Sequence, residues 1–321
     1  MTALESSWRP TAPLEHLRRR AELLRTIRSF FHQRGVLEVE TPQLAAATVT
    51  DLHLASLSCQ LAGPESPRLF LQTSPEFAMK RLLAAGSGAI FQICKAFRDD
   101  ERGRRHNPEF SLLEWYRPAF DHHRLMDEMD QLLAATLGVP AARRLTYAEL
   151  FEGELGVDPH RSDEAALTAA AERAGLDVPP GLDRDGLLHL LLACALEPRL
   201  GFDRPAFLFD FPASQAALAR LRPGTPAVAE RFEVYVRGME LANGFHELAD
   251  PGEQRRRFEA DLAARRNLGL PEVPIDEHLL AALEAGLPDC AGVALGLDRL
   301  VMLALGADSI EEVLAFPIER A

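Results

Sequence analysis

Two stretches of the chain gather charged side chains in a pattern that could hold a polyanion. Residues 97–116 read FRDDERGRRHNPEFSLLEWY: an arginine ends an apolar run, a loop dense in charge follows, and polar and apolar residues then alternate. Side chains alternate across a strand, so one face should carry an aromatic plate, a carboxylate and a phenol. This face comprises Phe110, Leu112, Glu114 and Tyr116. Taken alone, the segment also fits a hairpin with a solvated charged turn.

The second stretch is GVALGLDRL, residues 292–300. Small residues at positions 292, 294 and 296 would let a ligand approach the backbone closely. An apolar helix is expected over residues 297–305, with Arg299 in its first turn. A positive charge there opposes the helix dipole, and a bound anion would offset that effect. An ordinary glycine-rich turn with a surface arginine is the alternative.

A pair of carboxylates is expected in residues 233–240, EVYVRGME. A two-residue turn at positions 237–238 would place Tyr235 opposite Glu240, with Glu233 on the same face. Two carboxylates on one face repel unless a cation lies between them. Mg²⁺ bridging nucleotide phosphates would suit this pair, because it takes oxygen ligands and keeps some water. A solvated strand face is the alternative.

Hydrophobic spacing indicates the elements that position these residues. A helix is expected to start with Ser74 as N-cap, Pro75 at its first position and Glu76 in its first turn. Residues 140–200 are expected to form a helical insertion that acts as scaffold. Other helices are expected over 14–34, 121–137, 252–268 and 275–285, and strands over 36–40, 68–72, 89–97, 109–117, 205–211 and 231–248. The strands gather in hairpins with few crossovers, which predicts an α+β fold: an antiparallel sheet flanked by helices.

Composition narrows the class of protein. Of 321 residues, 35 are basic and 48 acidic, giving a net charge of −13, which argues against a general nucleic-acid binder. It suits an enzyme acting on small molecules or on a locally basic partner. Four scattered cysteines without a CxxC pair indicate reduced thiols. With neither a signal peptide nor a membrane-spanning stretch in the sequence, we expect a cytoplasmic protein without membrane contact.

The charged segments together resemble the class II aminoacyl-tRNA synthetases. FRDDERGRRHNPEF, residues 97–110, resembles motif 2, and GVALGLDRL resembles motif 3. FFHQRGVLEVETPQL, residues 30–44, resembles motif 1, with Pro42 in the place of its proline. HNPEF and ELANGFHEL point to the lysyl branch. The resemblance covers residues 14–317 and implies a single catalytic domain over residues 1–321.

The resemblance implies where ATP binds. Arg98 matches the arginine on the α-phosphate and Arg299 the one on the γ-phosphate, while Phe110 matches the aromatic residue that stacks on adenine, with Arg299 on the other face. Glu233 and Glu240 match glutamates that contact metal and ATP. The remaining nucleotide-binding positions are Asp100, Glu101, His106, Asn107, Leu241 and Gly296. A substrate carboxylate would attack the α-phosphorus, giving an aminoacyl-adenylate and pyrophosphate through positioning and charge stabilisation.

The same resemblance implies a pocket for a lysine-like substrate. Glu247, Glu114 and Tyr116 match the residues that bind the distal ammonium, and charge-assisted hydrogen bonds suit that group. Glu76 matches a residue that binds the backbone-side amine. The substrate-binding set is completed by Ser74, Pro75, Asn243 and Ala294.

Several features depart from the lysyl-tRNA synthetases. Fewer than twenty residues precede the first expected helix, too few for an oligonucleotide-binding barrel. Ala294 stands where those enzymes have glycine, which would reshape the pocket modestly. Asp99-Asp100 replaces the common Asn-Glu after the motif 2 arginine. With the acidic balance, these departures make tRNA a poor candidate partner.

These features, with LEWYRP and GVALGLDRLVMLALGA, resemble the synthetase paralogues that activate (R)-β-lysine with ATP and transfer it to a lysine of elongation factor P. Members of that family are homodimers with motif 1 at the interface. A minimal lysyl-tRNA synthetase, a non-catalytic paralogue and an amide synthetase are the alternatives. The sequence leaves open the choice between α- and β-lysine, the number of metal ions and the docking surface for the acceptor.

Overall fold

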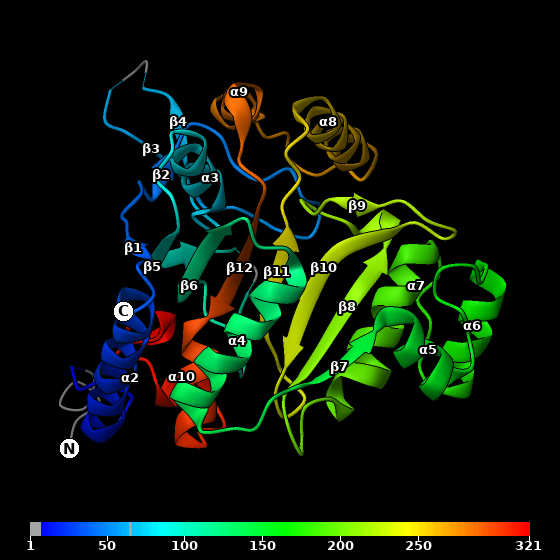
Figure 1. Cartoon of the computed structure of the whole chain (residues 1–321), viewed down its shortest axis with the longest axis horizontal. Coiled ribbons are helices and arrows are strands. Elements are labelled where there is room, and N and C mark those ends of the chain that lie inside the picture. The colour runs from blue at the N-terminus through cyan, green and yellow to red at the C-terminus, as the bar shows by residue number, and fades with distance from the viewer. Residues whose placement is uncertain (1–7, 64–65, 100) are drawn as a thin grey trace.

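A large, mainly antiparallel sheet organises the described part of the chain, which is residues 8–63, 66–99 and 101–321 of the computed structural model (Figure 1). Across the sheet the order is β1 (Leu37–Glu38), β5 (Ile90–Phe97), β6 (Glu109–Pro118), β12 (Cys290–Gly296), β11 (Glu240–His246), β10 (Val228–Tyr235), β8 (Ala206–Pro212) and β7 (Arg143–Thr146). The pairs β1–β5 and β7–β8 are parallel. β9 (Leu221–Arg222) pairs with β10, and β2 (Leu44–Ala45), β4 (Arg68–Leu71) and β3 (Ser58–Gln60) form a small second sheet.

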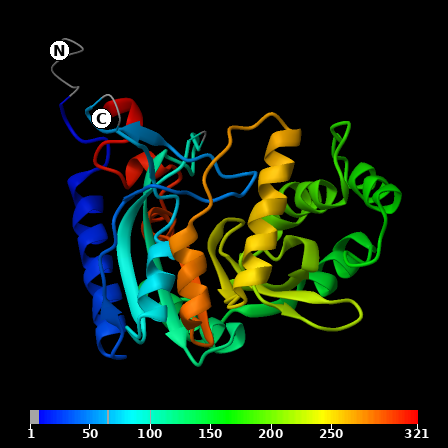
Figure 2. The ribbon, with the colours of Figure 1, turned by 90° about the horizontal axis from the view of Figure 1, so that it is seen from above.

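Helices flank this sheet, which confirms the expected α+β class. They are α2 (Leu14–His32), α3 (Glu76–Ala84), α4 (His122–Leu137), α5 (Tyr147–Leu155), α6 (Glu164–Arg173), α7 (Arg184–Leu191), α8 (Pro251–Asn267), α9 (Glu277–Gly286) and α10 (Leu297–Leu305). Figures 1 and 2 place α2 at one end of the molecule and α5–α7 at the other, beside β7 and β8. None of the described helices combines the length and apolar character needed to cross a membrane.

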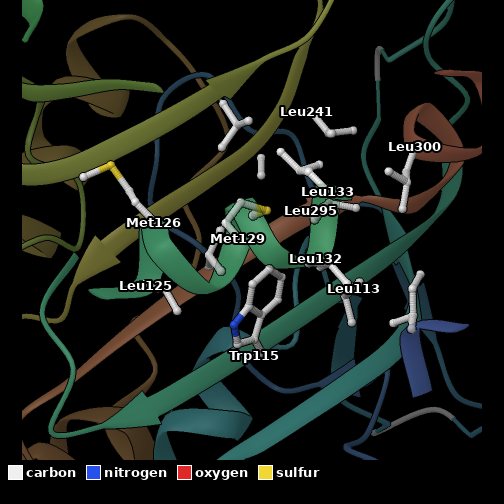
Figure 3. Close-up of a cluster of buried hydrophobic side chains, with 14 of the residues drawn as sticks. Leu113, Trp115, Leu125, Met126, Met129, Leu132, Leu133, Leu241, Leu295 and Leu300 are labelled. Atoms are coloured by element: carbon white, nitrogen blue, oxygen red, sulfur yellow. The ribbon is translucent and has the colours of Figure 1, made fainter. Parts of the chain in front are cut away.

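Helix α4 covers one face of the sheet and makes that face apolar. Its apolar residues recur at three- and four-residue steps and pack around Trp115 of β6 (Figure 3). The indole Nε1 donates to Oε2 of Glu128 at 3.1 Å, so the one polar atom of this ring is satisfied. Since Leu113 and Trp115 face α4, the intervening Glu114 and the following Tyr116 face the opposite side. That opposite side carries the predicted site.

The hairpin between β10 and β11 has the predicted turn. Arg237 and Gly238 have φ angles of 51° and 65°, and Val236 and Met239 exchange hydrogen bonds of 3.0 and 3.2 Å around them. Positive φ at both central residues matches the twist of the strands. The register pairs Tyr235 with Glu240, as expected.

Two local expectations are wrong. Residues 140–200 are not wholly helical, because residues 143–146 form strand β7 along β8. Their sequence, RRLT, begins with two exposed arginines and lacks apolar alternation, so its pairing depends on a distant strand. Ser74 is not the N-cap of α3: the helix begins at Glu76 with Pro75 before it. The Ser74 hydroxyl accepts a hydrogen bond from the Glu76 backbone N–H at 3.3 Å, a local turn that competes with capping.

Candidate active site

A buried lysine lies at the centre of the predicted amino-acid pocket. Lys80 comes from α3, and its Nζ lies 2.6 Å from Oε1 of Glu76 and 2.6 Å from Oε2 of Glu247. The side chains of Lys80 and Glu247 are each 1% exposed. Burial alone would lower the pKa of Lys80, but the carboxylates of Glu247 and Glu76 outweigh it and hold that pKa above its usual range. The pocket therefore contains an ammonium group of its own.

Next to this lysine, β6 contributes a carboxylate and a phenol. The Tyr116 hydroxyl donates to Oε1 of Glu114 at 2.7 Å. The other oxygen of Glu114, Oε2, is buried and accepts no hydrogen bond from the described residues. Burial and the nearby charge of Glu76 raise the pKa of Glu114 to about 8, and burial raises that of Glu247 to about 7 against the opposing charge of Lys80. A ligand with N–H donors and positive charge would satisfy these carboxylates.

Strand β12 supplies the small residues beneath this pocket. A Cβ added at Gly292 would lie 2.2 Å from Cε1 of Tyr116 and 2.6 Å from Oε1 of Glu247. Only glycine therefore lets both side chains lie across the strand. Ala294 pairs with Glu114 on one side and with Asn243 on the other, so it lies in the same row.

The hairpin brings Glu233 and Glu240 to a second acidic centre. Arg231 Nη2 donates to Oε1 of Glu233 at 2.5 Å, and the Tyr235 hydroxyl donates to its Oε2. Burial and repulsion by Glu233 raise the pKa of Glu240 to about 7. A cation held between the two carboxylates would relieve that repulsion, so this pair fits the Mg²⁺ expected with a nucleotide.

The two arginines expected to bind ATP each contact neighbouring groups of the protein. The Arg98 guanidinium lies 5.0 Å over the Phe110 ring, and its Nη1 donates to Glu101 at 3.0 Å. Its Nε is buried and has no acceptor among the described residues. Arg299, from α10, donates to the Glu240 carbonyl at 2.7 Å, and its Nη2 lies 2.6 Å from Nε2 of His106. Burial and the charge of Arg299 lower the pKa of His106, which favours the neutral ring.

The remaining predicted residues occupy different settings. Asn107 uses both ends of its amide inside the protein, because it donates to the Glu109 carbonyl at 2.5 Å and accepts from the Ile318 N–H at 3.0 Å. The side chain of Leu241 points into the core under α4, so only its backbone is left to contribute to the site. Gly296 is the N-cap of α10. Asp100 lies outside the described residues.

Sequence reasoning missed two charged residues of the site. Lys80 follows Glu76 by four residues, the spacing at which helical side chains pair. Arg231 precedes Glu233 by two residues on β10 and so shares its face; its Nε also lies 3.3 Å from Oδ1 of Asn243. Both spacings were visible in the sequence, but the burial of Lys80 was not.

The mainly antiparallel sheet, the motif 2 arginine and the motif 3 arginine define a class II synthetase catalytic domain. The chain belongs to the class II tRNA synthetases (D, K and N), whose family model matches residues 7–320. It is 58% identical to the elongation factor P–(R)-β-lysine ligase of Vibrio cholerae, over 98% of this chain and 99% of that protein. The protein of the same name from Klebsiella pneumoniae is 54% identical, again over 98% and 99% of the two chains.

Proposed function

We propose that this chain is an ATP-dependent ligase that activates (R)-β-lysine and joins it to a lysine side chain of elongation factor P. One observation carries the choice of a diamino acid: the buried, unpaired Oε2 of Glu114 lies in a pocket with more carboxylates than cations. The names of the relatives, which cover nearly the whole chain, support the β-isomer and the acceptor protein. α-Lysine is the competing substrate.

The proposed reaction has two steps. Glu114 and Glu247 hold the distal ammonium and Glu76 the other amine, so the substrate carboxylate is directed toward Arg98. Its oxygen attacks the α-phosphorus of ATP, the bond to the bridging oxygen breaks, and pyrophosphate leaves beside Arg299. The acceptor lysine, as free amine, then attacks the acyl carbon and releases AMP with loss of a proton. Mg²⁺ held by Glu233 and Glu240 would neutralise charge on the phosphates.

We further propose a homodimer that works in the cytoplasm. The segment resembling motif 1 carries two large apolar side chains at the surface, Leu37 at 55% and Leu44 at 40% exposure, and pairing two copies would cover them. The four cysteines are unpaired, which suits a reducing compartment. The net charge of −13 disfavours tRNA as the acceptor.

The test is the intact mass of elongation factor P after incubation with this enzyme, ATP, Mg²⁺ and (R)-β-lysine. We expect a mass gain of one lysyl group, in a larger fraction of the acceptor with (R)-β-lysine than with α-lysine. Lysine tRNA in a parallel reaction serves as the competing acceptor. Charged tRNA beside unmodified elongation factor P would contradict the proposal in favour of a minimal tRNA-charging enzyme.

Between pH 6 and pH 8 the amino-acid KM is expected to fall by about tenfold through Glu247 alone, and further through Glu114. Burial raises the pKa of Glu114 to about 8 and of Glu247 to about 7, while an ammonium substrate needs the ionised forms. Pyrophosphate exchange over this range measures the effect. Tyr116→Phe removes a hydrogen bond that lowers the pKa of Glu114, so the pH profile of KM in this variant should move to higher pH. A flat profile in both proteins would contradict this assignment.

The raised pKa values of Glu114 and Glu247 also predict how the stability of the protein changes with pH. Their folded pKa values lie above the ordinary 4.5, so the folded protein binds more protons than the unfolded chain between about pH 4.5 and 8. Their contribution to the free energy of unfolding therefore falls as pH rises through this window. Bound (R)-β-lysine should reduce that fall, which thermal unfolding at several pH values would measure.

Gly292→Ala is expected to raise the amino-acid KM and lower the unfolding temperature. The added methyl would overlap the Tyr116 ring and Glu247, and overpacking of this kind costs about 1–3 kcal/mol. The matched control is Gly153→Ala in α5, where a Cβ meets nothing within 4 Å and alanine favours the helix. Equal behaviour of the two variants would show that Gly292 is not needed for close approach.

A further inference from the structure

A second polar cluster lies on the opposite face of the sheet, behind the amino-acid pocket. It consists of His122 at the start of α4, Glu230 on β10 and His246 on β11, each offering a ligand atom within 4.8 Å of the others. Successive residues of a strand point to opposite faces, so His246 faces α4 while Glu247 faces the pocket. No step of the proposed ligase reaction uses this cluster.

Two buried groups, one in the cluster and one beside it, lack hydrogen-bond partners among the described residues. His122 is 1% exposed, and neither of its ring nitrogens has a partner. Oδ1 of Asp210 is also buried and has no hydrogen-bond partner; it lies 3.8 Å from Nε2 of His122, within ion-pair distance but too far for a hydrogen bond. Burial of an unsatisfied polar group is unfavourable, so two such groups facing one another point to a ligand between them.

His246 is oriented as metal-binding histidines are. Its Nε2 lies 3.0 Å from Oδ1 of Asp289, and its Nδ1 lies 2.6 Å from Oε2 of Glu230. A carboxylate on one ring nitrogen fixes the ring and leaves the other nitrogen for a metal. Here Asp289 would be the outer partner, and Nδ1 would share the metal with Glu230.

The strands are irregular at this point. The pairing of β10 with β8 shifts between Ala229 and Phe232, so Asp210 alone opposes two residues of β10, one of them Glu230. Asp210 also has a φ of 59°, a conformation that side chains other than glycine seldom adopt. A bulge of this kind re-aims side chains.

The net charge around the cluster is negative, which favours a bound cation. Arg222 bonds Asp210 and lies 3.7 Å from Glu230, while Arg220 bonds Asp289 at 2.7 Å. Three carboxylates against two guanidinium groups leave one negative charge beside two imidazoles. The basic groups therefore do not neutralise the cluster.

We propose that His122, His246 and Glu230, with Asp210 as the fourth ligand, bind one divalent transition-metal ion of the Zn²⁺ type. Imidazole nitrogens and carboxylate oxygens in a set of four suit that ion. The ion takes the place of the hydrogen bond between Nδ1 of His246 and Oε2 of Glu230, and a proton held there passes to solvent. The ion joins α4 to three strands behind the pocket, and its role is structural.

The test uses tag-free, chelator-treated full-length protein titrated with Co²⁺ and with Zn²⁺. One equivalent of Co²⁺ should produce visible d–d absorption, Zn²⁺ should displace it, and Zn²⁺ should raise the unfolding temperature. His122→Ala should abolish stoichiometric binding. Asp289→Asn, which alters only the outer partner, should weaken it by about 10- to 100-fold.

His123→Ala is the matched control, because its ring lies 4.1 Å from the His122 ring but outside the cluster. This variant should bind the metal as the unaltered protein does. Circular dichroism and pyrophosphate exchange establish that each variant is folded, and Glu230→Gln replaces His122→Ala if the latter is not. Absence of one-equivalent binding, or equal binding by the folded ligand variants, overturns the proposal.

Discussion

Lys80→Met should abolish amino-acid activation and lower the stability of the protein. The substitution keeps the length of the side chain but removes the cation that lies 2.6 Å from both Glu76 and Glu247. Removing one partner of a buried ion pair costs about 3–5 kcal/mol, because the other charge is left without compensation. The unpaired carboxylates would also bind protons more tightly, and a protonated pocket no longer attracts an ammonium group.

Thermal unfolding and pyrophosphate exchange measure these two effects separately. Arg81→Met is the matched control, since it removes one positive charge from the same helix at an exposed position; it should change neither quantity appreciably. Adding Glu247→Gln to Lys80→Met removes the more deeply buried of the two carboxylates left without Lys80, so the double variant should regain part of the stability while remaining inactive. If Lys80→Met were as stable and active as the Arg81 variant, the pocket would not depend on its internal lysine.

Arg98→Ala should lower the rate of adenylate formation by about 10²–10³-fold with little loss of stability, since removal of one preorganised donor at a developing oxyanion has an effect of this size. Within the described residues, Arg98 leaves its buried Nε without an acceptor, and a phosphate oxygen would supply one. Arg98→Lys should recover only part of the rate, because an ammonium group cannot reproduce the guanidinium fork.

Single-turnover formation of the adenylate is the measurement for Arg98. Lys95→Ala is the control from β5, the strand that ends just before Arg98: the Lys95 ammonium pairs with Glu109 at the surface, 3.2 Å away, and its loss should leave the rate unchanged. If the two variants lost the same fraction of the rate, Arg98 would act only through the general charge of the surface.

Much of the fold could be predicted because its signals are local. The apolar steps of α4, the positive-φ turn at Arg237-Gly238 and the alternation of β6 each depend on neighbouring residues. Of the two errors, one lies where a distant contact decides, because strand β7 has a polar sequence and forms through its pairing with β8. The other is local: two hydrogen-bonding geometries are open to Ser74, and it accepts from the Glu76 N–H in a turn instead of capping the helix.

The candidate site shows the same division. Its carboxylates could be placed on shared faces from strand periodicity, and the hairpin register that pairs Tyr235 with Glu240 was predicted from its turn. What sequence spacing could not supply is which charges are buried together. Lys80 would be read as an ordinary surface residue of an amphipathic helix, yet it reaches Glu247, which is distant in the sequence. The contacts of ATP and of the amino acid remain predictions.

Lys80 fixes the net charge of the pocket, and this charge determines which amino acids the pocket favours. When ionised, Glu76, Glu114 and Glu247 carry three negative charges, and Lys80 removes one of them. Two charges are left, the number that a diamino acid brings as ammonium groups. A monoamino acid of the same shape would leave one carboxylate buried without a counterion, a difference that a hydrophobic pocket cannot create. The pocket would thus disfavour amino acids with a single ammonium group through charge balance, whatever their shape.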